Sequence, residues 1–322
     1  MKILVISGFL GAGKTTFIQA MTKKTGRDFV VYENEYGRAD VDTKLLETNA
    51  ELSVWESTEN CVCCSGKADF ASAVLTISGT LDPEYLIVEP TGVAKLSSLL
   101  DNIRKIQYER ISLLQSVVIV DASCFLRQKQ QYPDIYLDQL CTASTVVCSK
   151  TERANPEELE QLQEEILRLN PGAEIICAPY SQLPAAWWNQ LLDRPLDTQR
   201  LQKSEAQFEE SRFESMSLDQ IALPSPTQLI SFLNALTAGV FGQIPRAKGL
   251  LPCGSEWLRF DVVDRSWAIT GTEPLEPSQC VFIGSELYRA GLREILIPGW
   301  KPAVSTRVVR KKSLFSSSAV IQ

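Results

Sequence analysis

The sequence predicts an α/β domain with a mostly parallel sheet, followed by a smaller α+β domain. In residues 1–192 short apolar runs alternate with helical stretches, which is typical of a parallel sheet with helices on both faces. Residues 193–210 are polar and lack a strand pattern, so we expect a linker there. In residues 211–300 the regular alternation of strands and helices gives way to mostly strand-like runs, and these residues form the second predicted domain. The basic tail, residues 301–322, has a serine cluster near its end and is predicted to be disordered.

Short apolar runs in the first domain indicate buried strands, because a strand covered on both faces is apolar throughout. The predicted strands are Lys2–Gly8, Phe29–Glu35, Leu52–Glu56, Tyr85–Glu89, Ser116–Asp121, Thr145–Ser149 and Glu174–Ala178. Helical stretches lie between them. The predicted helices are Lys14–Lys24, Lys67–Ile77, Lys95–Ile106, Asp134–Ala143, Pro156–Leu169 and Leu183–Leu192. Pro156, with two glutamates after it, is typical of a helix N-terminus.

The second domain is predicted to hold mostly antiparallel strands and two helices. The expected strands are Arg212–Leu218, Ile244–Leu251, Trp257–Val263, Trp267–Thr270 and Cys280–Gly284. The expected helices are Ser225–Ala238 and Glu286–Ile295. The strands Trp257–Val263 and Trp267–Thr270 are expected to form a hairpin that turns at Asp264-Arg265-Ser266.

Composition excludes several classes of function. The chain has 32 Lys and Arg against 39 Asp and Glu, a net charge of −7, so we expect no nucleic-acid partner. No apolar run approaches the roughly 18 residues of a membrane span, and the N-terminal apolar run is too short for a secretory signal. We therefore expect a cytoplasmic protein with no membrane partner. The chain has no histidine, which excludes histidine bases and ligands.

Residues 8–15, Gly-Phe-Leu-Gly-Ala-Gly-Lys-Thr, match the P-loop pattern between a predicted strand and a predicted helix. In this pattern the glycines let backbone N–H groups surround a phosphate at a helix N-terminus. Lys14 is expected to reach the β- and γ-phosphates, and the Thr15 hydroxyl to bind Mg²⁺. The sequence thus predicts a P-loop NTPase domain. The expected nucleotide-binding residues of the loop are Gly11, Ala12, Gly13, Lys14, Thr15 and Thr16.

A P-loop also needs an acidic side chain near the metal, at the end of a neighbouring strand. Glu89 ends the strand that begins at Tyr85, and we expect it to act with Lys14 in catalysis and to complete the Mg²⁺ site. Gly92 follows three residues later and is expected to offer its N–H to the γ-phosphate. Asp121 ends another apolar strand and is a weaker second candidate for the metal.

Ser149-Lys150-Thr151-Glu152 is a variant of the Asn-Lys-x-Asp pattern that binds guanine. A carboxylate at the last position accepts the N1–H and amino protons of guanine, which adenine does not offer in the same arrangement. Ser149, Lys150 and Glu152 are therefore predicted to bind the base. Glutamate adds one methylene to the usual aspartate, and the chemistry favours GTP over ATP.

Three cysteines, Cys61, Cys63 and Cys64, occur within four residues, and Ser65-Gly66 directly after them permits a tight turn. Clustered thiolates bind zinc and other thiophilic metals. Glu33 or Glu35 is an available oxygen ligand. A redox switch is the alternative, because exposed clustered thiols oxidise readily. The other six cysteines are scattered and are predicted to be buried apolar residues: Cys124, Cys141, Cys148, Cys177, Cys253 and Cys280.

Together these motifs resemble the CobW-type metallochaperone GTPases, relatives of the nickel-delivery GTPases UreG and HypB. The resemblance also rests on Glu33-Asn34-Glu35-Tyr36-Gly37, Glu89-Pro90-Thr91-Gly92, Val120-Asp121-Ala122, Arg246-Ala247-Lys248-Gly249 and Val281-Phe282-Ile283-Gly284. Two positions depart from the family: Asn60 replaces a glycine before the first cysteine, and Arg38 replaces a frequent acid. Arg38 removes a possible metal ligand.

The resemblance implies slow GTP hydrolysis coupled to delivery of zinc or cobalt to a client metalloprotein. It implies Cys61, Cys63 and Cys64 as ligands of the transition metal, with Glu33 as an oxygen ligand. The alternative hypothesis is a nucleotide-dependent binding adaptor or redox sensor that uses the cysteine cluster and hydrolyses little nucleotide. The sequence does not predict the client or the oligomeric state.

Overall fold

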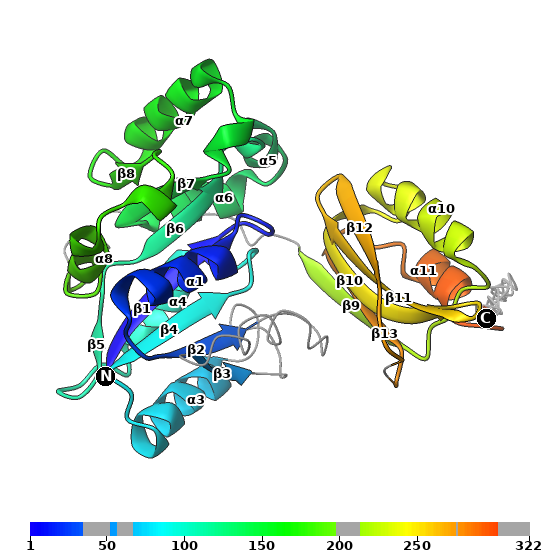
Figure 1. The fold of residues 1–322 in the computed structure, drawn as a ribbon, viewed down its shortest axis with the longest axis horizontal. Helices are drawn as coiled ribbons and strands as arrows, with labels where there is room; N and C mark the ends of the chain where they lie inside the picture. Colours follow the sequence, from blue (N-terminus) through cyan, green and yellow to red (C-terminus); the bar gives the residue numbers. More distant parts are fainter. Residues whose placement is uncertain (35–51, 57–66, 198–212, 275, 302–322) are drawn as a thin grey trace, which may run out of the picture.

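The computed structural model describes residues 1–34, 52–56, 67–197, 213–274 and 276–301, which form two β-sheets with helices around them (Figure 1). The first sheet is parallel throughout its described strands, in the order β3-β2-β4-β1-β6-β7-β8, with the short β5 beside β1. The second sheet is antiparallel, in the order β12-β11-β10-β13-β9. This arrangement confirms the predicted fold class.

The elements of the first sheet follow the predicted order, except that the sequence did not predict the short β5. Its strands are β1 (Lys2–Gly8), β2 (Phe29–Asn34), β3 (Leu52–Glu56), β4 (Tyr85–Pro90), β5 (Ser112–Leu113), β6 (Val117–Asp121), β7 (Thr145–Ser149) and β8 (Glu174–Ile176). Its helices are α1 (Lys14–Thr25), α3 (Lys67–Thr80), α4 (Leu96–Arg104), α5 (Phe125–Gln131), α6 (Pro133–Thr142), α7 (Pro156–Leu169) and α8 (Ala185–Leu191). The sequence did not predict α5, because only Phe125 and Gln128 of this helix are buried and they form no apolar stripe.

Helices cover both faces of the first sheet because its strands are apolar on both sides. Along β1, Leu4 and Ile6 pack with residues of α1 and α8 on one face. Ile3 and Val5 pack with residues of α3, α4, α6 and α7 on the other. The continuous apolar runs in the sequence therefore reflect burial on both sides, as predicted.

Capping fixes the start of α7 at the predicted residue. The Asn155 side chain accepts a hydrogen bond from the Glu158 N–H, and the Glu158 carboxylate accepts one from the Asn155 N–H. Pro156 is the first helical residue, where a missing N–H costs no intrahelical hydrogen bond.

The second sheet and its two helices follow the predicted elements with shifted ends. The elements are β9 (Glu214–Asp219), α10 (Pro226–Thr237), β10 (Gln243–Cys253), β11 (Glu256–Val263), β12 (Ser266–Gly271), β13 (Gln279–Ser285) and α11 (Arg289–Leu296). The predicted three-residue turn is wrong by one residue, since Ser266 already pairs with Val263. The predicted helix start at Glu286 is also wrong, because the helix begins at Arg289. Glu286 has a φ of 57°, a left-handed backbone conformation that does not occur inside a right-handed α-helix.

One face of the second sheet packs against α10 and α11, and residues from its other face join the core of the first domain. Val281 and Ile283 of β13 belong to that core cluster. The ring of Phe213 also lies 5.2 Å from that of Tyr132, measured between centroids. The predicted domain boundaries stay predictions, and the linker and tail lie partly outside the described residues.

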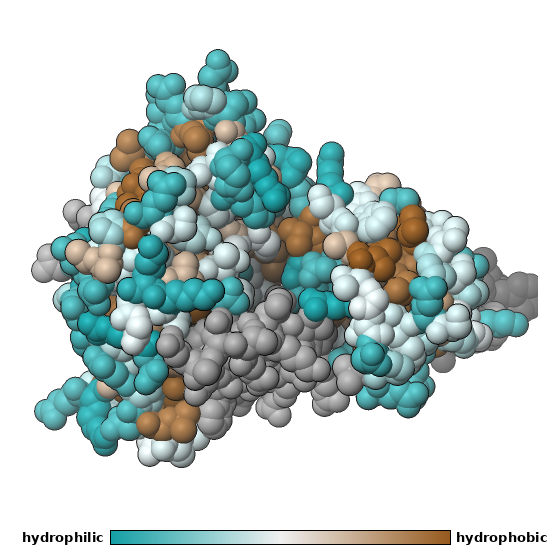
Figure 2. Space-filling view, viewed as in Figure 1, coloured by the Kyte–Doolittle hydropathy of each residue, from teal (hydrophilic) through white to brown (hydrophobic). Residues whose placement is uncertain are grey.

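Polar side chains dominate much of the visible surface, around the outer edges of the structure (Figure 2). Among the described residues, no helix has both the length and the apolar character that crossing a bilayer requires.

Trp188 of α8 is the largest fully buried side chain among the described residues, and its ring lies 4.9 Å from that of Phe17 on α1. We expect Trp188→Ala to lower the free energy of unfolding by about 3–5 kcal/mol, because it removes a large apolar side chain and leaves a cavity. Urea unfolding followed by far-UV circular dichroism measures the change. Leu75→Ala on α3 is the control, since Leu75 is 45% exposed. Equal losses in the two variants would contradict the assigned packing.

Candidate nucleotide site

The P-loop joins β1 to α1 at the centre of the first sheet. Gly8, Gly11 and Gly13 all have positive φ angles, of 143°, 73° and 96°. A Cβ at Gly8 would lie 2.3 Å from the carbonyl oxygen of Ile119 on β6, so only glycine fits this close approach. Gly13 is the N-cap of α1 and has no side chain to occupy the first backbone N–H groups of the helix. These groups are therefore available to an anion.

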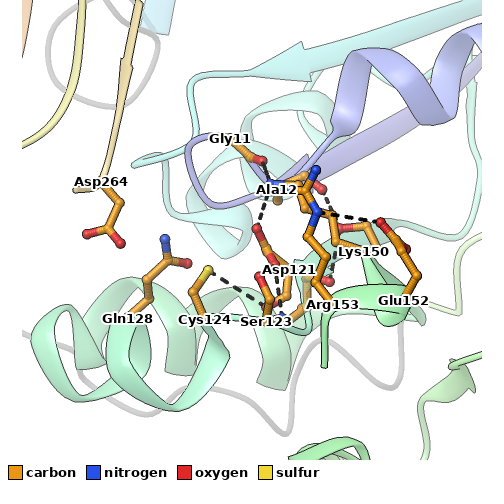
Figure 3. Close-up of polar contacts among 12 residues, drawn as sticks. Gly11, Ala12, Asp121, Ser123, Cys124, Gln128, Lys150, Glu152, Arg153 and Asp264 are labelled. Atoms are coloured by element: carbon orange, nitrogen blue, oxygen red, sulfur yellow. Dashed lines mark hydrogen bonds and ion pairs between the residues drawn. The ribbon is translucent and has the colours of Figure 1, made fainter. Parts of the chain in front are cut away.

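Side chains from the end of β7 hold two carbonyl groups of the P-loop (Figure 3). The Ser149 hydroxyl donates to the Ala12 carbonyl at 2.6 Å. The Lys150 ammonium donates to the Gly11 carbonyl at 2.9 Å and to the Asp121 carboxylate at 2.6 Å. The predicted base-binding segment and the P-loop are therefore one connected structure. Lys150 itself has a left-handed backbone, with a φ of 54°.

Lys14, Thr15 and Glu89 lie together at the carboxyl ends of β1 and β4. The Thr15 hydroxyl is 3.2 and 3.3 Å from the two oxygens of Glu89, and the buried Lys14 ammonium is 3.9 Å from Glu89 Oε1. Lys14 also donates to the Gly8 carbonyl at 3.3 Å. A hydroxyl beside a carboxylate is a donor set of hard oxygens, which suits Mg²⁺. Thr16 is exposed on α1.

The predicted γ-phosphate sensor, Gly92, touches the backbone of the P-loop. A Cβ at Gly92 would lie 2.4 Å from the Leu10 nitrogen, so this position also requires glycine. The buried Gln139 of α6 donates to the carbonyls of Gly92 and Ala94, at 3.2 and 3.1 Å. The sequence did not predict this role for Gln139, because a single glutamine in an amphipathic helix carries no motif.

Asp121 lies with the base-binding segment rather than with Thr15. Burial raises the pKa of its carboxyl group, but hydrogen bonds from Lys150 and Ser123 outweigh burial and hold the pKa below the ordinary value of 3.8. The Ser123 hydroxyl donates to Asp121 at 2.6 Å. Asp121 thus acts as the anionic partner that fixes Lys150 against the P-loop.

Glu152, the predicted guanine ligand, follows Lys150 in a short 3₁₀ turn, Thr151–Arg153. Its side chain is 71% exposed and lies 3.7 Å from the Arg153 guanidinium (Figure 3). The structure therefore leaves this carboxylate accessible beside a segment that is already fixed on the P-loop.

The predicted cysteine ligands Cys61, Cys63 and Cys64 lie outside the described residues. The predicted oxygen ligand Glu33 is half-buried at the end of β2. Its Cα pairs in register with Glu89 of β4 on one side and with Glu56 of β3 on the other. Within the described ranges, no group of three or more acidic or cysteine side chains is arranged to hold a metal ion.

The family model described as "CobW/HypB/UreG, nucleotide-binding domain" matches residues 2–177, which is more than half of the chain. The chain belongs to the CobW/HypB/UreG family. The match covers β1 to β8 and every nucleotide-contact residue that we predicted. It confirms the predicted family resemblance and the P-loop nucleotide-binding domain.

Two curated relatives from Escherichia coli are similar to part of this chain. Zinc chaperone YeiR is 32% identical over 162 residues, which are 49% of this chain and 49% of YeiR. Zinc chaperone YjiA is 28% identical over 191 residues, which are 57% of this chain and 59% of YjiA. The chain thus spans about half the length of these relatives.

Two solved structures are also similar to this chain. The Zn(II)-bound YjiA GTPase from Escherichia coli has a TM-score of 0.43 at 19% identity, and the match covers 92% of this chain and 98% of the YjiA chain. HypB from Helicobacter pylori in complex with nickel has a TM-score of 0.41 at 19% identity and covers 59% and 85%, respectively.

Lys14→Ala is expected to weaken nucleotide affinity about 10- to 150-fold, because a hydrogen bond to a charged group contributes about 1.5–3 kcal/mol. Titration with a fluorescent guanosine diphosphate measures the affinity. Lys2→Ala is the matched control, since Lys2 lies at the start of β1, at the end of the strand away from the P-loop, and pairs with Asp193. A Lys14 variant that binds as tightly as the control would contradict the assigned site.

Asp121→Asn is expected to lower the free energy of unfolding by about 1.5–3 kcal/mol at pH 7, because it removes the charged partner of Lys150. The folded-state pKa of Asp121 lies below its ordinary value, so its contribution is complete above about pH 4 and is lost as pH falls through the folded-state pKa. Urea unfolding between pH 7 and pH 3 should therefore show the two proteins converging in acid. Asp101→Asn, an exposed residue on α4, is the control. A difference that does not change with pH would refute this account.

Proposed function

We propose that this protein binds GTP and hydrolyses it slowly, and that its nucleotide state controls the binding of a transition metal, zinc or cobalt, for delivery to a client metalloprotein. The observation that carries the proposal is the register of β2 with β4. It sets Glu33, the proposed metal ligand, directly beside Glu89, which hydrogen-bonds the Thr15 hydroxyl of the phosphate site.

The phosphate end of the site supports hydrolysis at a slow rate. Lys14 would neutralise the phosphate oxygens, and Thr15 with Glu89 would hold Mg²⁺, which when bound neutralises charge that develops on the phosphates. Fast hydrolysis further requires a group that orients the attacking water. Neither the sequence motifs nor the described part of the structure assigns a residue to that task, and we propose that a partner supplies groups that accelerate turnover.

Guanine as the base is supported by the carboxylate of Glu152 and by the fixed position of its neighbour Lys150. The Lys150 stem would lie along the base while its ammonium stays on the Gly11 carbonyl. The Glu152 carboxylate would accept the N1–H and amino protons of guanine. Adenine has an acceptor at N1, so this carboxylate would disfavour ATP.

The link between nucleotide and metal is supported by the order of the strands. The chain leaves β3 after Glu56, whose Cα is in register with Glu33, and it enters α3 at Lys67. The cysteine cluster lies in sequence between these two elements. A nucleotide that moves Glu89 would therefore change the surroundings of Glu33 and of the segment that carries the cysteines.

The names of the relatives support zinc as the metal and a protein as its recipient. YeiR and YjiA are zinc chaperones, and a relative from Dictyostelium discoideum is a zinc-regulated GTPase metalloprotein activator. We extend this role to the present chain as a proposal, together with a cytoplasmic location.

Zinc affinity is expected to differ about tenfold or more between the GDP-bound protein and the protein with a nonhydrolysable GTP analogue and Mg²⁺, which is within the usual range of allosteric coupling. Competition against a chromophoric chelator measures it in each state. Cys63→Ala/Cys64→Ala should abolish tight binding in all states.

Cys141→Ala is the matched control for this experiment, because Cys141 is a half-buried thiol on α6, outside the predicted metal site. Equal zinc affinity in the empty, GDP and GTP-analogue states would refute the coupling. Weak zinc binding together with rapid oxidation of the cluster by peroxide would favour the redox adaptor instead.

A further inference from the structure

The structure brings together two cysteines that the sequence leaves far apart. Cys148 and Cys177 are separated by 29 positions, yet their sulfur atoms lie 2.7 Å apart. The prediction that the six scattered cysteines are buried holds for three of them, Cys148, Cys253 and Cys280. It is wrong for the other three, which are half-buried: Cys124, Cys141 and Cys177.

The backbone at this pair suits a disulfide. β7 and β8 are parallel neighbours in which Val147 pairs with Ile176. Cys148 is the next residue of β7, and Cys177 follows Ile176 just beyond the end of β8. Neighbouring strands lie about 4.7–4.9 Å apart, within the Cα separation of about 4.4–6.8 Å that a disulfide spans. An S–S bond therefore requires little backbone movement.

The two thiols have different environments, which gives them different roles in oxidation. β8 is an edge strand of the sheet, and Cys177 just beyond it is half-buried, whereas Cys148 is buried. The hydrogen bond from the Cys148 thiol lowers the pKa of Cys177, while that same bond and burial raise the pKa of Cys148. Cys177 is thus the thiol that reacts first, and Cys148 resolves.

We propose that Cys148 and Cys177 form a redox modification site, oxidised to an intramolecular disulfide by peroxides and restored by thiol reductants. The Cys177 thiolate attacks a peroxide oxygen, the O–O bond breaks, and the leaving hydroxide takes a proton to become water. Cys148 sulfur then attacks the Cys177 sulfenic acid, the S–O bond breaks, and a second water leaves with the Cys148 proton. Two thiols lose two electrons and two protons, and hydrogen peroxide becomes two water molecules.

This site is joined directly to the nucleotide site. Cys148 is followed by Ser149 and Lys150, whose side chains hold the carbonyls of Ala12 and Gly11. An S–S bond of about 2.05 Å brings the two sulfurs closer than their present 2.7 Å, and even a small shift of Cys148 passes directly to Ser149 and Lys150, which follow it in the chain. Oxidation therefore weakens nucleotide binding. The inference rests on the nucleotide-binding domain and is independent of metal delivery.

The test uses the full chain with Cys61→Ser, Cys63→Ser and Cys64→Ser, so that oxidation of the cluster does not contribute. After treatment with hydrogen peroxide, free thiols are alkylated and the digest is searched by mass spectrometry for a peptide linked through Cys148 and Cys177. Fluorescent GDP affinity is measured before oxidation, after it, and after dithiothreitol. We expect the linked peptide and an affinity about tenfold weaker, restored by the reductant.

Cys177→Ala and Cys148→Ala are each expected to make the GDP affinity insensitive to peroxide. If one of the two variants folds poorly, the other still tests the pair. Cys141→Ala keeps the pair and should respond as the parent does. Absence of the linked peptide would overturn the redox site. A linked protein that binds GDP as tightly as the reduced one would overturn the connection to the nucleotide. Neither result bears on the proposed delivery of zinc, because both are measured on a protein that lacks the cysteine cluster.

Discussion

The close fit of the P-loop backbone against its neighbours is the constraint on which the rest of this structure depends. Gly8 leaves no room for a Cβ against β6, and Gly92 leaves none against Leu10. Neighbouring side chains donate hydrogen bonds to the carbonyls of the loop. Ser149 and Lys150 donate two of these bonds, and Lys14 of α1 donates a third. These side chains hold the loop carbonyls in place, and the first N–H groups of α1, which no cap side chain occupies, are available to phosphate. A shift of β6 relative to β1 would therefore change the phosphate site.

Local patterns were sufficient to predict most of the fold and the phosphate site. Lys14, Thr15 and Glu89 lie where the P-loop motif and the strand end placed them, because the carboxyl ends of parallel strands share one edge of a sheet. Hairpin and helix ends were less accurate, since the left-handed backbone of Glu286 leaves no mark in the periodicity of apolar residues.

Contacts between distant segments were beyond sequence reasoning. Gln139 and the Cys148–Cys177 pair both depend on which strands and helices become neighbours, and an alternation of strands and helices does not fix that order. Asp121 shows the same limit. Its position at a strand end suggested a metal ligand, but the neighbouring strand supplies Lys150 and makes the carboxylate a counterion.

Aromatic rings connect the P-loop with the second domain. Phe9 of the loop stacks on Tyr132 at 5.0 Å, and Tyr132 contacts Phe213 at 5.2 Å, measured between ring centroids. A Cβ at Gly11 would also lie 2.2 Å from Cγ1 of Val263, at the end of β11. Arg127 of α5 forms an ion pair with Asp264 in the adjacent hairpin turn. The second domain therefore lies against the loop that binds phosphate, and movement of that loop requires this contact to adjust.

The strand order explains how one nucleotide can be linked to two kinds of sulfur chemistry. β1 lies between β4 and β6, so β2 with Glu33 is two strands away on one side and β7 with Cys148 is two strands away on the other. At about 4.8 Å per strand, each lies about 10 Å from the central strand. On the β2 side the proposed connection runs through Glu89, whose Cα is in register with that of Glu33. On the β7 side it runs through hydrogen bonds to P-loop carbonyls, so a covalent change at Cys148 would reach the loop without passing through the β2 side, where we propose the metal site.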